Sequence, residues 1–244
     1  MAHVNKEPET NRFYDGPNRQ LPFGTGDRVD AYEVRRYSGR SQKFIDRLER
    51  ACLRQMIRDQ KSSPGETVLD IPCGFGRIAP ILVEMGLKPL WGDISLAMAR
   101  RVSMRPDAIA AVGQFVGDAE HVPLASNSVE GATCIRLLEH FRHGETRARV
   151  MRELGRVVRS WVIVSFYDRA SIHGKTKSLA CKLQGKKVVV AMQSRASLLA
   201  EANAAGLELK SFRAPARFVH AHTFALLVPW KDSPLHGRAG KKLS

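Results

Sequence analysis

A strand-like run, a glycine turn and a helical pattern follow one another within residues 67–85, and this unit constrains the fold more than any other feature. Residues 67–72 form a short and largely apolar run of the kind that a strand buried on both faces shows. Gly74 and Gly76 then allow a tight turn, and residues 77–85 carry apolar side chains at helical spacing. A strand that leads through a turn into a helix is the repeating unit of a parallel sheet.

The same alternation continues along the chain. Further strands are expected at residues 89–92, 114–117, 129–135 and 161–166, and helices at 95–104, 138–158 and 194–205. A strand-like run, VVVAM (188–192), follows the basic insertion, and a closing pair of strands is expected at 207–212 and 218–228. Strands that alternate with helices imply an α/β fold whose parallel sheet is covered on both faces.

The segments around this core differ from it in composition. Residues 1–30 are polar and rich in turn formers, which predicts a mobile N-terminal arm. Residues 31–62 carry apolar side chains at helical spacing on a basic background and predict an N-terminal helical segment. The main domain is expected at 63–230 with a basic insertion at 168–192, and a basic C-terminal tail follows at 231–244.

The net charge of +15 points to an anionic partner. Nucleic acid, phosphorylated glycans and the head groups of an acidic membrane surface, bound peripherally, all fit this charge. No apolar run approaches the roughly 20 residues that cross a bilayer, and the first residues lack a signal-peptide pattern, so a cytoplasmic protein is expected. The four cysteines lie far apart without a C-x-x-C pair, which favours neither a zinc knuckle nor a disulfide framework.

Two ligands compete for the glycine turn. Gly74, Gly76 and Ala79 match the dinucleotide pattern G-x-G-x-x-A, and Asp93 follows at the end of the second strand, where it could bind a ribose. Asp70 argues against a dinucleotide, because a carboxylate near the end of the first strand would repel a pyrophosphate placed at the turn. An amino-acid ammonium group would suit Asp70 better.

Four stretches in order resemble class I S-adenosylmethionine (SAM)-dependent methyltransferases of the ubiquinone and menaquinone C-methyltransferase-like branch. VLDIPCGFGRIAPILVEMG (68–86) resembles motif I, and WGDISLAMAR (91–100) resembles the motif of the second strand. FVGDAEHVPLASNSVEGATCIRLLEHF (115–141) and RELGRVVRSWVIVSF (152–166) are similar to the segments around the fourth and fifth strands. The resemblance implies a Rossmann-like, doubly wound, seven-stranded and mostly parallel sheet with a final antiparallel strand.

The resemblance also implies SAM as the cofactor and a set of residues that bind it. Asp70 would face the methionine amine, Asp93 would bind the ribose hydroxyls, and Asp118 would accept from the adenine amino group. For these acids the alternative is a helix cap or a turn former. The remaining cofactor residues line the turn, the adenine or the sulfonium: Pro72, Cys73, Gly74, Gly76, Ile94, Ala119, Arg136 and Leu137. Pro72 replaces the first motif glycine, which stiffens the start of the turn.

His140 is the leading candidate for a general base, because the branch often carries histidine one turn beyond the sulfonium contact. A partly exposed histidine at the start of a helix is the alternative reading. Tyr167, at the carboxyl end of the fifth strand, is a second candidate. No metal site is expected, since His140 and His143 lack a third ligand. His220 and His222 share a strand face, for which a solvated face or a subunit contact is expected.

These features predict a methyltransferase that acts on an anionic small-molecule, glycan or lipid-linked acceptor. In this family the insertion after the fifth strand often forms part of a substrate lid, and the lysines of 168–192 could bind phosphate or carboxylate there. An RNA methyltransferase is the alternative acceptor class, although the [DNS]-P-P-[FYW] motif is absent after the fourth strand, which reads IRLLEH. A non-catalytic SAM-fold binding protein is the alternative outside the enzyme class.

Overall fold

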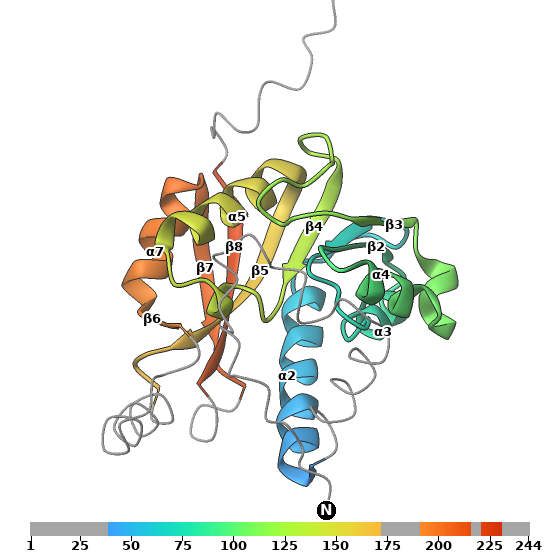
Figure 1. Ribbon diagram of the computed structural model, residues 1–244, viewed down its shortest axis with the longest axis horizontal. Helices are drawn as coiled ribbons and strands as arrows, with labels where there is room; N and C mark the ends of the chain where they lie inside the picture. The colour runs from blue at the N-terminus through green and yellow to red at the C-terminus, as the bar shows by residue number, and fades with distance from the viewer. Residues whose placement is uncertain (1–38, 172–190, 216–220, 231–244) are drawn as a thin grey trace, which may run out of the picture.

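The computed structural model describes residues 39–171, 191–215 and 221–230, and builds them around one eight-stranded sheet (Figure 1). The strands are β1 Thr67–Asp70, β2 Lys88–Asp93, β3 Gly113–Val116, β4 Val129–Cys134, β5 Val158–Asp168, β6 Met192–Gln193, β7 Leu207–Arg213 and β8 His222–Pro229. The helices are α2 Arg40–Arg58, α3 Ala79–Glu84, α4 Leu96–Ser103, α5 Gly144–Val157 and α7 Arg195–Ala204, with 3₁₀ turns η2 Pro106–Ala110 and η3 Leu138–His140.

The sheet has the strand order β3-β2-β1-β4-β5-β8-β7, and β6 pairs with β5 off this path. The final strand β8 runs antiparallel to both β5 and β7, and the other described pairs are parallel. The doubly wound, mostly parallel sheet with a final antiparallel strand is therefore confirmed. The order reverses at β1, where the path leads through β2 to β3 on one side and through β4 to β5 on the other.

Helices cover both faces of the sheet because its central strands are apolar on both (Figure 1). On one face α5 and α7 pack over β4, β5 and β8, where the buried side chains include Val150, Leu154, Leu198, Val162 and Ala225. On the other face α2 and α3 pack over β1 and β5, with Leu53, Ile57, Ile81, Val68 and Ile163 buried together. Helix α2 is thus part of the core layer.

Two expectations about the elements need correction. The helix expected at 138–158 begins only at Gly144, because η3 turns Leu138 and Phe141 into the core, and the Arg147 guanidinium donates to the Phe141 carbonyl at 2.7 Å. The resemblance implied seven strands, whereas the sheet has eight among the described residues. The short strand β6 forms because β5 extends past the end of β4, so that Tyr167 and Asp168 are available to pair with it.

Several predicted segments fall wholly or largely outside the described residues. These are the arm at 1–30, most of the insertion at 168–192, the tail at 231–244 and His220. Among the helices that the structure describes, none is long and apolar enough to cross a membrane.

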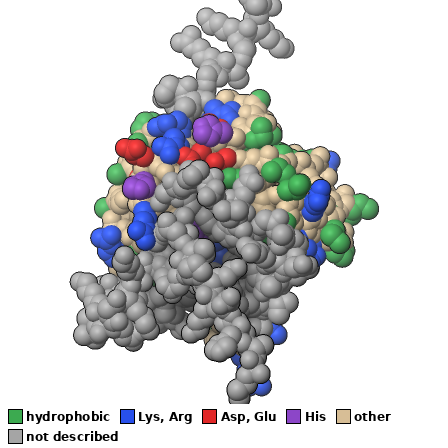
Figure 2. Space-filling model, viewed as in Figure 1, with side chains coloured by type: hydrophobic (Ala, Val, Ile, Leu, Met, Phe, Trp, Pro, Cys, Tyr) green, Lys and Arg blue, Asp and Glu red, His purple; other side chains and the backbone are tan. Residues whose placement is uncertain are grey.

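The β3 edge of the sheet carries exposed hydrophobic side chains. They lie on α4, η2 and β3 and just beside them: Leu96, Met104, Ile109, Val112 and Val116. Figure 2 shows hydrophobic side chains gathered on this side of the molecule. Away from this edge, the sheet is closely packed between α5 and α2. The Trp161 ring, for example, lies directly against Gly131.

We predict that Gly131→Ala lowers the melting temperature. A Cβ at Gly131 would lie 2.1 Å from Cε2 of the buried Trp161 ring, whose indole N–H donates to Ser62 Oγ at 3.0 Å. Overpacking of this kind costs about 2 kcal/mol. Gly113→Ala is the control, because its Cβ would meet only Leu90 Cδ1, at 3.7 Å. Thermal unfolding followed by circular dichroism measures both, and equal melting temperatures would contradict the prediction.

Candidate functional site

A pocket opens at the carboxyl ends of β1, β2, β3 and β4, the edge at which open α/β sheets bind ligands. Most of the predicted cofactor residues line it: Pro72, Cys73, Gly74, Asp93, Ile94, Asp118, Ala119, Arg136 and Leu137. His140 lines it as well. Three predicted residues, Asp70, Gly76 and Tyr167, do not belong to the lining and are described separately below.

The two glycines of the turn differ in what they do. Both have left-handed backbone conformations, with φ of +54° at Gly74 and +82° at Gly76. A Cβ at Gly76 would lie 2.5 Å from Arg105 Cδ and 2.7 Å from Val102 Cγ2, so Gly76 lets the turn pack against α4 and its C-terminal end. A Cβ at Gly74 would meet nothing within 4 Å, so Gly74 leaves the pocket open.

Asp93 fastens the glycine turn to the end of β2. Its carboxylate accepts from the backbone N–H of Gly74 and from that of Ser95, each at 2.9 Å. Burial raises the pKa of Asp93 to about 6, although these backbone hydrogen bonds favour its ionised form. The N-cap of α4 is Ser95, whose side chain accepts from Met98 N, so the helix-cap reading of Asp93 does not hold. Its carboxylate lies in the pocket wall.

Asp70 is an acid whose burial is only half compensated. It is 1% exposed at the end of β1, and its Oδ1 accepts from Thr133 Oγ1 of β4 at 2.7 Å. Its Oδ2 has no hydrogen-bond partner among the described residues. Burial, with a smaller contribution from the charge of Asp93, raises the pKa of Asp70 to about 7, against the opposing effects of Thr133 and Arg77. A buried carboxylate oxygen without a donor fits a cationic ligand group.

Arg136 stands at a strained position just after β4. Its φ is 63°, which is uncommon for a residue other than glycine, and its backbone N–H donates to Ser165 Oγ at 2.7 Å. Leu137 follows it in the pocket wall. On the other side of the pocket, Asp118 Oδ1 accepts from the Glu120 N–H at 3.0 Å, as a turn former does, and Ala119 lies beside it.

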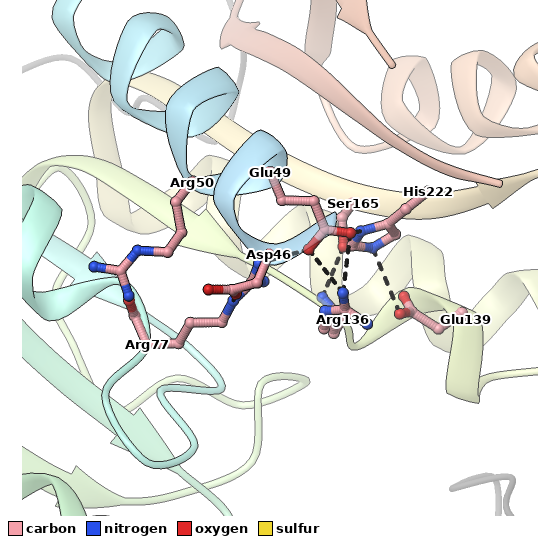
Figure 3. Close-up of polar contacts among 8 residues, drawn as sticks. All are labelled: Asp46, Glu49, Arg50, Arg77, Arg136, Glu139, Ser165 and His222. Carbon is pink, nitrogen blue, oxygen red and sulfur yellow. Dashed lines mark hydrogen bonds and ion pairs between the residues drawn. The ribbon is translucent and has the colours of Figure 1, made fainter. Parts of the chain in front are cut away.

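A buried acid, Glu49, joins the pocket wall to helix α2 (Figure 3). Its carboxylate lies 2.5 Å from Arg77 Nη2 and 2.7 Å from Arg136 Nη2, and both arginines line the pocket. Burial alone would raise the pKa of Glu49, but the charges of His222, Arg136 and Arg77 hold it well below its usual range.

Our sequence analysis missed Glu49 and Arg77, although a signal for Glu49 existed. Glu49 precedes Leu53 by four residues and Met56 by seven, so it lies on the apolar stripe of α2 where a charge is out of place. His222 was wrongly expected on a solvated face or at a subunit contact. It is 1% exposed, and its Nδ1 lies 2.8 Å from Glu49 Oε1, because β8 is covered on this face by α2.

The two candidate catalytic residues lie in different surroundings. His140 ends the 3₁₀ turn η3, is half-buried and lines the pocket. Tyr167 is not among the lining residues, because its ring packs toward His222 with 5.5 Å between the ring centroids. The pocket therefore favours His140 over Tyr167 as a group near the ligand.

Comparisons with known proteins agree with this geometry. Residues 69–165 match the family model of a methyltransferase domain, and no curated protein sequence matches the chain significantly. The magnesium protoporphyrin IX methyltransferase of Synechocystis PCC 6803 with bound S-adenosylhomocysteine (SAH) is a similar structure. It has a TM-score of 0.69 and 15% identity, with 86% of this chain and 97% of that chain covered.

Two SAM-dependent methyltransferases of other organisms are also similar in structure. That of Methanosarcina mazei has a TM-score of 0.58 at 16% identity, with 72% of this chain and 97% of that chain covered. That of Thermotoga maritima has a TM-score of 0.56 at 18% identity, with 84% and 97% covered. The fold is thus similar to that of these SAM-dependent methyltransferases, and the residues that match the family model run from β1 into β5.

We predict that Asp70→Asn stabilises the ligand-free protein in a pH-dependent way. Below about pH 3 the acid is protonated in both the folded and the unfolded chain. Between pH 4 and 7 the unfolded chain loses this proton first, because burial raises the folded pKa to about 7, and the wild-type protein therefore loses stability relative to the variant. The melting temperatures of the wild-type protein and of Asp70→Asn should differ little at pH 4 and most at pH 8. A difference that does not grow with pH would contradict this assignment.

Proposed function

We propose that this protein is a SAM-dependent methyltransferase that methylates an anionic small-molecule, glycan or lipid-linked acceptor. The observation that carries the proposal is the pair of buried acids at the ends of β1 and β2, one of them with an oxygen that lacks a donor among the described residues. A ligand with an ammonium group and a ribose would supply a cation to Asp70 and hydroxyl donors to Asp93. The family match over 69–165 supports the same ligand.

A dinucleotide fits these residues poorly. The Gly74 amide, at the position where dinucleotide folds offer N–H groups to a pyrophosphate, donates to the carboxylate of Asp93. A pyrophosphate at the turn would lie beside two carboxylates whose pKa values are already raised by burial. The acid pair therefore favours SAM over a nicotinamide cofactor.

In the proposed reaction the protein holds the cofactor, aligns the acceptor with it and removes a proton from the acceptor. When bound, SAM supplies a methyl group on a sulfonium that is already activated for transfer. Asp70 would hold the methionine ammonium, Asp93 would hold the ribose, and Ile94 and Ala119 would pack beside the adenine, with Asp118 as its hydrogen-bond acceptor. Arg136 and Leu137 would contact the part of the cofactor around the sulfonium. His140 accepts the proton of an acceptor hydroxyl or carbon acid.

The proposed acceptor class rests on charge. The net charge of +15 favours an anion, and the Synechocystis enzyme that resembles this chain methylates a small molecule, magnesium protoporphyrin IX. We also propose that the chain belongs to the ubiquinone and menaquinone C-methyltransferase-like branch and that the protein is cytoplasmic. The basic insertion at 168–192 is proposed to contribute cations for the acceptor.

We expect Asp93→Ala to weaken SAH binding by more than tenfold. The substitution removes both the ribose acceptor and the acceptor that fastens the Gly74 and Ser95 amides. Isothermal titration calorimetry of the folded full chain at pH 8 measures the affinity. Glu208→Ala is the matched control, because this acid is exposed on β7, pairs with Lys210 at 3.0 Å and does not line the pocket. Undiminished affinity in Asp93→Ala would remove Asp93 from the ribose role.

His140→Ala should lower methyl transfer more than it lowers SAH affinity, because a proton acceptor acts on the transfer step. The assay incubates the full chain with radiolabelled SAM and fractionated lysate, and follows label into small metabolites, glycans, lipids and RNA. Label in RNA would favour the RNA methyltransferase alternative. SAH binding without label transfer in any fraction would favour the non-catalytic binding protein. Equal losses of transfer and affinity in His140→Ala would count against a base.

A further inference from the structure

Glu49 is the side chain that brings three distant parts of the chain together. Arg77 comes from the turn before α3, Arg136 from the turn after β4 and His222 from the start of β8. Figure 3 shows these groups converging on the Glu49 carboxylate. A fully buried carboxylate is stable only when such partners neutralise it, so the position of α2 and the positions of these side chains depend on one another.

The two arginines differ in how else they are held. Arg77 also donates from Nε to Asp46 Oδ1 at 2.7 Å, one helical turn before Glu49 on α2. The backbone of Arg136 is fixed by Ser165, but its guanidinium is held by both oxygens of Glu49, at 2.9 and 2.7 Å. Both arginines thus take their orientation from α2.

Both arginines lie at the end of the pocket next to Asp70. The charge of Arg77 acts on Asp70, the acid with the unbonded oxygen, and Arg136 follows β4, the strand that supplies Thr133 to Asp70. Under the proposed function this is the end that receives the amino-acid part of the cofactor. An acid next to guanidinium groups suits a zwitterion, which carries an ammonium and a carboxylate together.

We propose that Glu49 is a positioning residue through which α2 orients Arg77 and Arg136 toward the amino-acid end of the cofactor pocket. The docking of α2 and the binding of the cofactor are then coupled, and the coupling is reciprocal. This inference rests on the proposed function. Helix α2 thereby contributes to cofactor binding, in addition to the glycine turn and to the acids at the strand ends.

The first test uses binding of two ligands. Glu49→Gln should weaken SAH binding by about tenfold, and should leave binding of 5′-methylthioadenosine, which lacks the amino-acid end, within about twofold. Asp46→Asn, which affects only Arg77, should have a smaller effect on SAH. Glu84→Gln is the matched control, because it removes another ion pair of α2, with Arg54 at 2.8 Å, whose partners do not line the pocket. Equal losses for the two ligands would overturn the inference.

The second test needs no variant and so does not depend on whether Glu49→Gln folds. In the wild-type full chain, SAH should slow hydrogen exchange at amides of residues 49–57, whereas 5′-methylthioadenosine should protect the glycine turn without protecting α2. Absence of SAH protection in α2 would overturn the inference. If the wild-type chain binds neither ligand, the proposed function itself fails. If it binds SAH and Glu49→Gln binds equally well, only the role of Glu49 is lost.

Discussion

The burial of two carboxylates at the ends of neighbouring parallel strands is the constraint on which the pocket depends. Asp70 and Asp93 both leave water, and both have pKa values raised by that burial. Asp93 is compensated within the chain, because the Gly74 and Ser95 amides donate to it and thereby shape the turn. Asp70 is compensated on one oxygen only, by Thr133. The fold thus carries an unfavourable charge that a suitable ligand can relieve, which links stability to binding.

The same logic extends to α2, which sequence patterns present as an ordinary amphipathic helix. Its C-terminal half is held by Leu53, Met56 and Ile57 through burial of apolar surface. Its middle is held by the ion pairs of Glu49 with Arg77 and Arg136, and both arginines line the pocket. Apolar packing places the helix on the sheet, and the buried ion pairs fix which side chains meet there.

Much of the fold could be predicted because it follows from local patterns. The strand–turn–helix unit at Gly74 and Gly76 and the alternation after it define the sheet, and most predicted ligand residues line one pocket because strand ends meet at one edge. The start of α5, the pairing of β6 and the partners of Glu49 and His222 could not be predicted. They depend on contacts between residues far apart in the chain, such as the 173-residue separation of Glu49 and His222.

Arg136 has a left-handed backbone conformation that destabilises the fold, and a guanidinium that stabilises it by pairing with Glu49. A side chain at φ 63° strains the main chain by about 1 kcal/mol, which glycine would relieve. Replacement by glycine would therefore trade relief of backbone strain against loss of the guanidinium, and the two effects would oppose each other in any measurement of folding. The guanidinium also neutralises the buried carboxylate of Glu49, so the backbone strain at Arg136 accompanies the placement of a positive charge beside that acid.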